Sequence, residues 1–112
     1  EYELLALLRR LKREAAAQGG RVITLLGNHE VLNAAGVTVY ASPRSAARFA
    51  GSRASAFRPG TELAVELSSW PVACVVGDTA FVHAGLTPEA ARQLIGGSST
   101  GATRWLLGAD EG

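Results

Sequence analysis

The start of the chain constrains the fold most, because a helical pattern, a glycine pair and a short apolar run follow one another within 27 residues. Leucines and alanine recur every three or four positions in residues 1–17, opposite a basic side, which predicts an amphipathic helix. Gly19 and Gly20 can adopt the left-handed backbone that ends a helix. Residues 22–26 are apolar and partly β-branched, which predicts a strand covered on both faces. Together they favour an α/β fold, in which ligands gather at the carboxyl ends of strands.

Two further helices are predicted in the middle of the chain. Ser42 and Pro43 have the chemistry of an N-cap and a first helical position, which predicts a helix through residue 49. Residues 62–70 carry apolar side chains at helical spacing, and the proline that follows marks a boundary. Residues 31–36 fit a helical turn only ambiguously.

The last third of the chain predicts a β-hairpin followed by a helix. Residues 72–76 and 80–83 are apolar runs, and the Gly-Asp-Thr sequence at 77–79 suits the short connection between them. Residues 87–89 read Thr-Pro-Glu, which is typical of a helix start. The small residues at 96–101 predict a loop.

Composition excludes some classes of protein. A chain of 112 residues with 47% hydrophobic and 19% charged residues is typical of one soluble globular domain. A formal net charge of +1 gives no general field that would attract nucleic acid or membranes. No apolar run approaches the ~20 residues that a transmembrane helix needs. We therefore expect neither a nucleic-acid partner nor a membrane segment in this chain.

The absence of methionine indicates a piece of a longer protein. The chain begins directly in a helical pattern, at Glu1, rather than with the methionine of a natural start. We therefore expect sequence upstream of it, and no compartment follows from the residues present.

The two histidines of the chain have the same setting. His29 lies in a Gly-Asn-His-Glu sequence, and His83 lies in Val-His-Ala-Gly-Leu; each follows a predicted strand and lies close to a glycine. Asn28, imidazole and Glu30 all offer ligand atoms for a first-row divalent ion. Each histidine alone also fits a hydrogen-bonded structural residue, and Glu30 fits a surface carboxylate or a residue of a helix start. Their joint occurrence favours a functional site.

These residues resemble conserved blocks of the calcineurin-like metallophosphoesterases. Residues 27–30 match the third block in the form found in phosphoprotein phosphatases, and residues 82–88 resemble the later VHGGLSP block with two substitutions. Residues 30–36 and the arginine-rich region after them are most similar to Shewanella-like protein phosphatases. The resemblance runs from residue 4 to about residue 107. It implies that residues 1–112 are the central fragment of one calcineurin-like phosphoesterase domain, and hence part of an αββα β-sandwich flanked by helices.

The resemblance also implies an activity. It is the metal-dependent hydrolysis of phosphomonoesters, most simply of a phosphorylated protein, at a centre of two divalent ions such as Mn, Fe or Zn. Asn28 and His83 would ligate the same ion, and a water of lowered pKa would supply the hydroxide nucleophile. His29 would be the general acid for the leaving oxygen, not a ligand. Glu30 would hold the backbone around the site without touching a metal.

The departures from the family pattern limit this chain. The earlier GDxHG and GDxxDRG blocks are absent, and there is no third histidine to act as a further ligand. We therefore expect the fragment alone to be inactive and to show an unpaired apolar sheet edge. Alternatives are a hydrolase of small phosphoesters such as diadenosine polyphosphates, a non-catalytic pseudophosphatase that binds partners, or an α/β domain without a site.

The segment from residue 31 to residue 61 is basic. It contains Arg44, Arg48, Arg53 and Arg58 but no acidic residue. The favoured interpretation is a solvated, arginine-decorated insertion. The alternative is a local positive field that attracts phosphorylated substrate.

Overall fold

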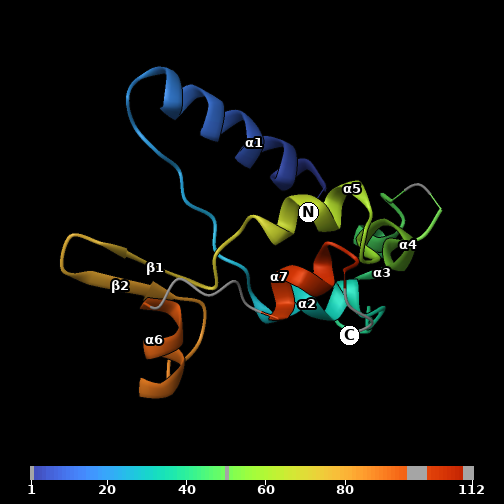
Figure 1. The fold of residues 1–112 in the computed structure, drawn as a ribbon. Coiled ribbons are helices and arrows are strands. Elements are labelled where there is room, and N and C mark those ends of the chain that lie inside the picture. The colour runs from blue at the N-terminus through green and yellow to red at the C-terminus, as the bar shows by residue number, and fades with distance from the viewer. Residues whose placement is uncertain (1, 50, 96–100, 110–112) are drawn as a thin grey trace.

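The structure is a computed structural model that describes residues 2–49, 51–95 and 101–109 (Figure 1). The elements in chain order are α1 (Tyr2–Ala17), α2 (Asn28–Ala34), α3 (Pro43–Ala46), α4 (Arg53–Phe57), α5 (Glu62–Ser68), β1 (Ala73–Val76), β2 (Thr79–Val82), α6 (Pro88–Ile95) and α7 (Gly101–Leu106). Helices dominate, and the described residues form one sheet of two strands. This mixed structure is consistent with the expected α/β class, whereas no second sheet layer of a β-sandwich is present among the described residues.

The helix predicted over residues 1–17 is confirmed as α1. It ends at Ala17, and Gly19, two residues later, has a φ of 75°, the left-handed conformation that glycine adopts without strain. Leu5 is buried and Leu8 packs against the core, whereas Leu4 and Leu11 are exposed. The helix therefore buries only part of its predicted apolar side.

The strand predicted for residues 22–26 is wrong. Residues 21–27 form an extended connection with no strand assignment, visible in Figure 1 as the long link between α1 and α2. A backbone hydrogen bond joins Leu26 N–H in this connection to Pro71 O at 2.9 Å. Leu26 is buried but Ile23 is 38% exposed. Apolar, β-branched residues make a strand only when a neighbouring strand supplies a ladder, and none of the described residues supplies one here.

The core lies among the helices. In Figure 1, α7 lies against α5, and α4 lies beside both α2 and α5. Leu67 of α5 and Leu106 of α7 are completely buried. The other buried apolar residues are Leu5, Leu26, Ala34, Phe49, Phe57, Ala64 and Trp70. This core supports the N-terminal turn of α2 from one side.

Hydroxyl N-caps begin three of the short helices. The side chains of Ser42, Ser52 and Thr61 each accept a hydrogen bond from the backbone N–H three residues later, at 3.1, 3.0 and 3.3 Å. Each satisfies one amide that the helix itself leaves unpaired. The N-cap predicted at Ser42 is confirmed, although α3 ends at Ala46 rather than at residue 49. The helix predicted over residues 62–70 is confirmed as α5.

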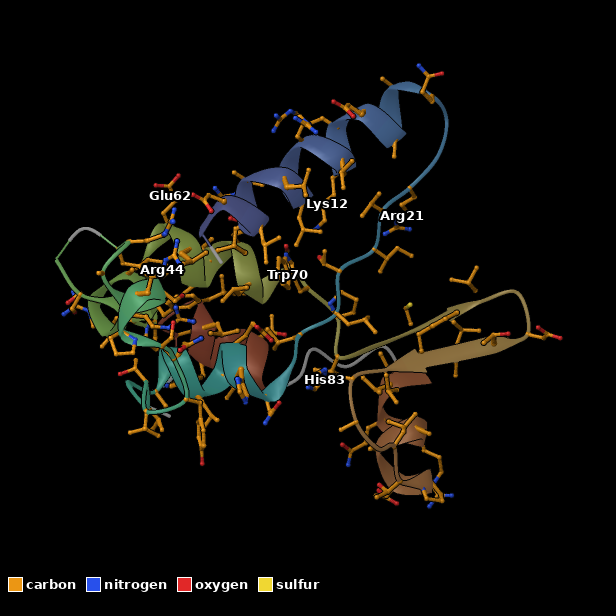
Figure 2. All side chains as sticks on the ribbon, turned by 180° about the vertical axis from the view of Figure 1, so that it is seen from behind. Lys12, Arg21, Arg44, Glu62, Trp70 and His83 are labelled. Carbon is orange, nitrogen blue, oxygen red and sulfur yellow. The ribbon has the colours of Figure 1, made fainter. Side chains whose placement is uncertain are left out.

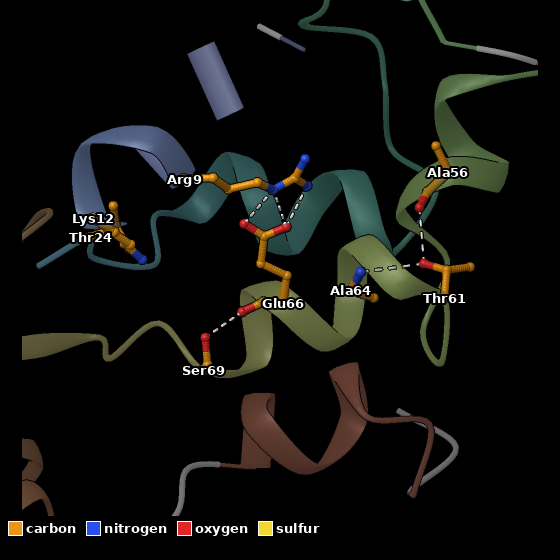
Figure 3. A network of polar contacts seen from close by, with 8 residues as sticks. All are labelled: Arg9, Lys12, Thr24, Ala56, Thr61, Ala64, Glu66 and Ser69. Carbon is orange, nitrogen blue, oxygen red and sulfur yellow. Dashed lines mark hydrogen bonds and ion pairs between the residues drawn. The ribbon is translucent and has the colours of Figure 1, made fainter. Parts of the chain in front are cut away.

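Polar contacts fix α1 to the rest of the chain (Figure 3). The guanidinium of Arg9 forms a forked ion pair with the carboxylate of Glu66 on α5, and Arg9 Nε lies 3.0 and 2.9 Å from its two oxygens. Lys12 Nζ donates to Thr24 Oγ1 at 2.7 Å and lies 5.1 Å from the centre of the Trp70 ring. These contacts hold the extended connection between α1 and the core.

The predicted hairpin is confirmed. β1 and β2 pair antiparallel, with Ala73 opposite Val82 and Val76 opposite Thr79. Val75, Val76 and Phe81 are 70, 54 and 48% exposed. No third strand pairs with this ribbon among the described residues. Within the described residues the ribbon is therefore a two-stranded sheet with exposed apolar side chains.

The helix predicted after the hairpin is confirmed as α6, with Thr87 Oγ1 accepting from Ala90 N–H at 3.2 Å. The loop predicted for residues 96–101 falls largely on residues 96–100, which lie outside the described residues, while Gly101 begins α7. Across the described ranges, no helix has both the length and the apolar character needed to cross a bilayer.

Candidate functional site

The Gly-Asn-His-Glu sequence forms the start of a helix, not a loop after a strand. Gly27 is the N-cap of α2, with extended φ and ψ of −101° and 172°, and Asn28, His29 and Glu30 are its first three residues. Successive residues on a helix point about 100° apart. The three side chains therefore reach different surroundings from one rigid turn.

Asn28 meets His83 at this turn. Asn28 Oδ1 lies 2.9 Å from His83 Nε2, although the two residues are 55 positions apart in the sequence. His83 directly follows β2, and Figure 2 shows it where the hairpin joins the helical part of the molecule. Both residues are exposed. The structure thus brings together the two residues that the sequence analysis expected to share an ion.

Glu30 holds the backbone beside this pair. Its Oε2 accepts a hydrogen bond from Gly27 N–H at 2.8 Å, which closes the first turn of α2. The reciprocal cap is missing because glycine has no side chain. The helix-start interpretation of Glu30 is therefore confirmed, and the same contact places its carboxylate next to the Asn28–His83 pair.

Gly27 lies at the centre of the arrangement and is buried. A Cβ added there would lie 2.6 Å from Glu30 Oε2 and 3.3 Å from two carbons of the His83 ring. Only a residue without a side chain allows the carboxylate and the imidazole to approach the backbone this closely.

Replacing Gly27 with alanine should therefore destabilise the protein. The methyl group would push the Glu30 carboxylate off the residue 27 N–H, and an unsatisfied buried amide costs about 1–3 kcal/mol. We expect thermal unfolding to show a Tm lower by at least about 4 °C. The matched control is Gly20→Ala, where the nearest atom to an added Cβ is at 3.5 Å. Equal Tm changes for the two variants would contradict this account of residue 27.

His29 faces a separate cavity. Its ring stacks on Tyr40, with centroids 5.5 Å apart and planes inclined by 27°. The cavity of about 160 Å³ is lined by His29, Leu32, Asn33, Val37, Tyr40, Ala41, Ser42, Ser45 and Arg53. The first turn of α2 thus connects the Asn28–His83 pair to a pocket that contains an exposed imidazole.

Arg53 is the main residue that sequence reasoning missed. Its side chain is buried, at 5% exposure, and it lies against the rings of Phe49 and Phe57 at 5.1 and 5.2 Å from their centroids. Its Nε donates to Asn33 Oδ1 at 2.9 Å, and its Nη1 donates to Ser45 Oγ at 3.3 Å. Phe57 lies four residues after Arg53 on α4, a spacing that could have indicated a shared, buried helix face.

The other arginines of the basic segment are on the surface. Arg44 and Arg58 are exposed. Arg48 is also exposed and forms an ion pair with Glu3 of α1. The solvated interpretation is therefore confirmed for these three and wrong for Arg53.

Asn28 and His83 offer two donor atoms at a separation that a metal ion can use. Two ligands about 2.1 Å from one octahedral ion, at adjacent positions, lie about 3 Å apart. The 2.9 Å between Asn28 Oδ1 and His83 Nε2 is the length of an ordinary hydrogen bond, as the structural interpretation of the histidine expected, and it also fits that separation. Among the described residues, no group of three or more His, Cys, Asp or Glu side chains gathers closely enough to hold an ion. The residues present therefore fit two ligands of a site, but not a complete one.

Comparisons with known proteins give a distant relationship. No protein-family model matches the chain, and no solved structure matches it significantly. An uncharacterized protein of Acanthamoeba polyphaga mimivirus, R398, is 33% identical over 75% of this chain and 38% of its own length. Shewanella-like protein phosphatase 2 of Arabidopsis thaliana is 30% identical over 80% of this chain and 34% of its own length. An uncharacterized protein of Schizosaccharomyces pombe, C1840.07c, is 36% identical over 70% of this chain and 26% of its own length.

The chain therefore spans between a quarter and two-fifths of the length of these relatives. One of them is named as a protein phosphatase. The fold and the comparisons together define a mixed helix and sheet protein with a distant similarity to that class of enzyme.

Proposed function

We propose that this chain is the central part of a calcineurin-like phosphoesterase domain that hydrolyses phosphomonoesters, with phosphorylated proteins as substrates. The observation that carries the proposal is the 2.9 Å contact between Asn28 Oδ1 and His83 Nε2. Two metal-compatible atoms from distant parts of the chain meet at the surface, on a turn that also carries a histidine. The similarity to a Shewanella-like protein phosphatase supports the class of reaction.

Asn28 and His83 would hold one of two divalent ions, with Mn, Fe and Zn as candidates. When bound, such a pair supplies charge neutralisation at the phosphoryl oxygens and an activated water. The remaining ligands would come from other parts of the whole protein. Glu30 would keep Gly27 N–H and the first turn of α2 fixed, so that the Asn28 amide stays in place.

His29 would protonate the leaving oxygen of the substrate. It follows Asn28 in the same turn of α2, it is exposed, and its ring lines the cavity described above. A general acid must reach the departing atom from a fixed position close to the phosphorus. The stacking on Tyr40 restricts the orientation of the imidazole for that role.

The test is a hydrolysis assay of the full-length protein that contains this chain. With Mn²⁺ it should hydrolyse p-nitrophenyl phosphate and a phosphopeptide, and a chelator should abolish both activities. The isolated 112-residue chain should hydrolyse neither. Cleavage of diadenosine polyphosphates without turnover of phosphopeptides would replace the proposed substrate class. Metal binding without any turnover would indicate a pseudophosphatase.

A further inference from the structure

The cavity beside His29 has a lining that favours one kind of ligand. Arg53, whose side chain carries only hydrogen-bond donors, is one of the residues that line the cavity. Asn33 Oδ1 accepts a hydrogen bond from Arg53 Nε at 2.9 Å. The other group of the same amide is its NH₂, which is a hydrogen-bond donor. Ser42 Oγ already accepts from Ser45 N–H at 3.1 Å, and its hydroxyl can also donate. The cavity is therefore rich in donors.

The segment that supplies most of the cavity lining carries formal charges of one sign. Residues 31–61, which supply every lining residue except His29, contain four arginines and no acidic residue. The guanidinium of Arg53 lies beside the adjoining rings of Phe49 and Phe57, and only 5% of the residue is exposed, which fixes its position and lowers its contact with water. A fixed cation in a partly enclosed site attracts an anion more strongly than a solvated one does.

The size of the cavity limits the ligand. Its 160 Å³ would hold about five water molecules. This is enough for the end of an acidic side chain but not for a second folded element. His29 and Tyr40 at its rim are exposed, so a substrate can enter from the surface.

We propose that this cavity is a specificity subsite that binds a carboxylate of the peptide substrate, close in sequence to its phosphorylated residue. The inference rests on the proposed function, because it takes His29 to face the leaving group. Arg53 and its neighbours then select phosphopeptides that carry Asp or Glu beside the phosphorylated residue. The enzyme prefers these peptides over neutral ones of the same size.

The experiment uses the full-length protein with Mn²⁺ and pairs of phosphopeptides that differ only by Glu or Gln, at each of the two positions before and after the phosphorylated residue. At one of these positions we expect kcat/KM to be about tenfold higher for the Glu peptide than for the Gln peptide. This is the ratio that one additional charge-assisted hydrogen bond to the substrate produces. Equal kcat/KM values at all four positions would overturn the proposal.

Two variants with the same change of charge locate the effect. In Ser45→Asp the new carboxylate replaces a hydroxyl that lies 3.3 Å from Arg53 Nη1, so it should occupy the site and abolish the preference for Glu. Ser52→Asp adds the same charge outside the cavity, at an N-cap where aspartate is well tolerated, and should keep the preference. Loss of the preference in both variants, or in neither, would contradict the assignment of the cavity.

The outcomes separate this inference from the proposed function. If p-nitrophenyl phosphate and both peptides are hydrolysed without selection, the subsite is wrong and the phosphoesterase stands. If no phosphoester is hydrolysed, the proposed function is wrong, and the subsite proposal, which rests on it, is wrong too.

Discussion

Replacing His29 with alanine should lower kcat of the full-length protein toward phenyl phosphate by about 10²–10⁴-fold, the usual contribution of a positioned general acid. The loss toward p-nitrophenyl phosphate should be much smaller, because nitrophenolate departs without needing a proton. The side chain is exposed and its ring contact is the stacking on Tyr40, so the substitution should leave the core intact. The measurement is kcat for a series of aryl phosphates of decreasing leaving-group acidity.

The comparison between substrates within one variant is the control for misfolding. A damaged structure would lower kcat for every phosphoester by a similar factor, whereas a missing acid makes kcat depend more steeply on the leaving group. Equal losses for phenyl and nitrophenyl phosphate would therefore remove His29 from the proposed proton transfer.

Replacing His83 with alanine should weaken the binding of Mn²⁺ to the full-length protein by 100-fold or more. Changing a residue that only supports a ligand typically costs 10–100-fold in metal affinity, and a ligand itself should cost at least as much. The variant also leaves Asn28 Oδ1 without the partner that it has at 2.9 Å. The measurement is calorimetric titration of the metal-free protein, and activity should partly return at high Mn²⁺ concentration.

The two histidine variants are controls for each other. His29→Ala should keep the metal affinity and lose the proton transfer, whereas His83→Ala should show the opposite pattern. If His29→Ala weakened Mn²⁺ binding as much as His83→Ala, the division of roles between the two imidazoles would be wrong.

Elements determined by neighbours in the sequence were predictable. The hydroxyl of Ser42 reaches an amide three residues away, the Gly-Asp connection joins two adjacent strands, and Thr87 begins α6 with the proline that follows it. Each of these depends on backbone geometry within a few residues, so the sequence alone carries the information.

Elements determined by distant partners were not predictable in the same way. Residues 22–26 have the composition of a buried strand, yet a strand exists only where another strand pairs with it. Arg53 belongs by composition to a solvated basic segment, and its burial depends on how α4 packs against α2. The contact between Asn28 and His83 was expected only from the resemblance to a family, because no local sequence pattern indicates a contact between residues 55 positions apart.

The position of His83 at the end of β2 has a consequence for the precision of the site. A ribbon of two strands is only marginally stable by itself. The imidazole of His83 therefore stays close to Asn28 only while β1 and β2 remain paired. A contact that covered the exposed valines and phenylalanine of the hairpin would stabilise the ribbon, and it would thereby raise the affinity of the protein for its proposed ion.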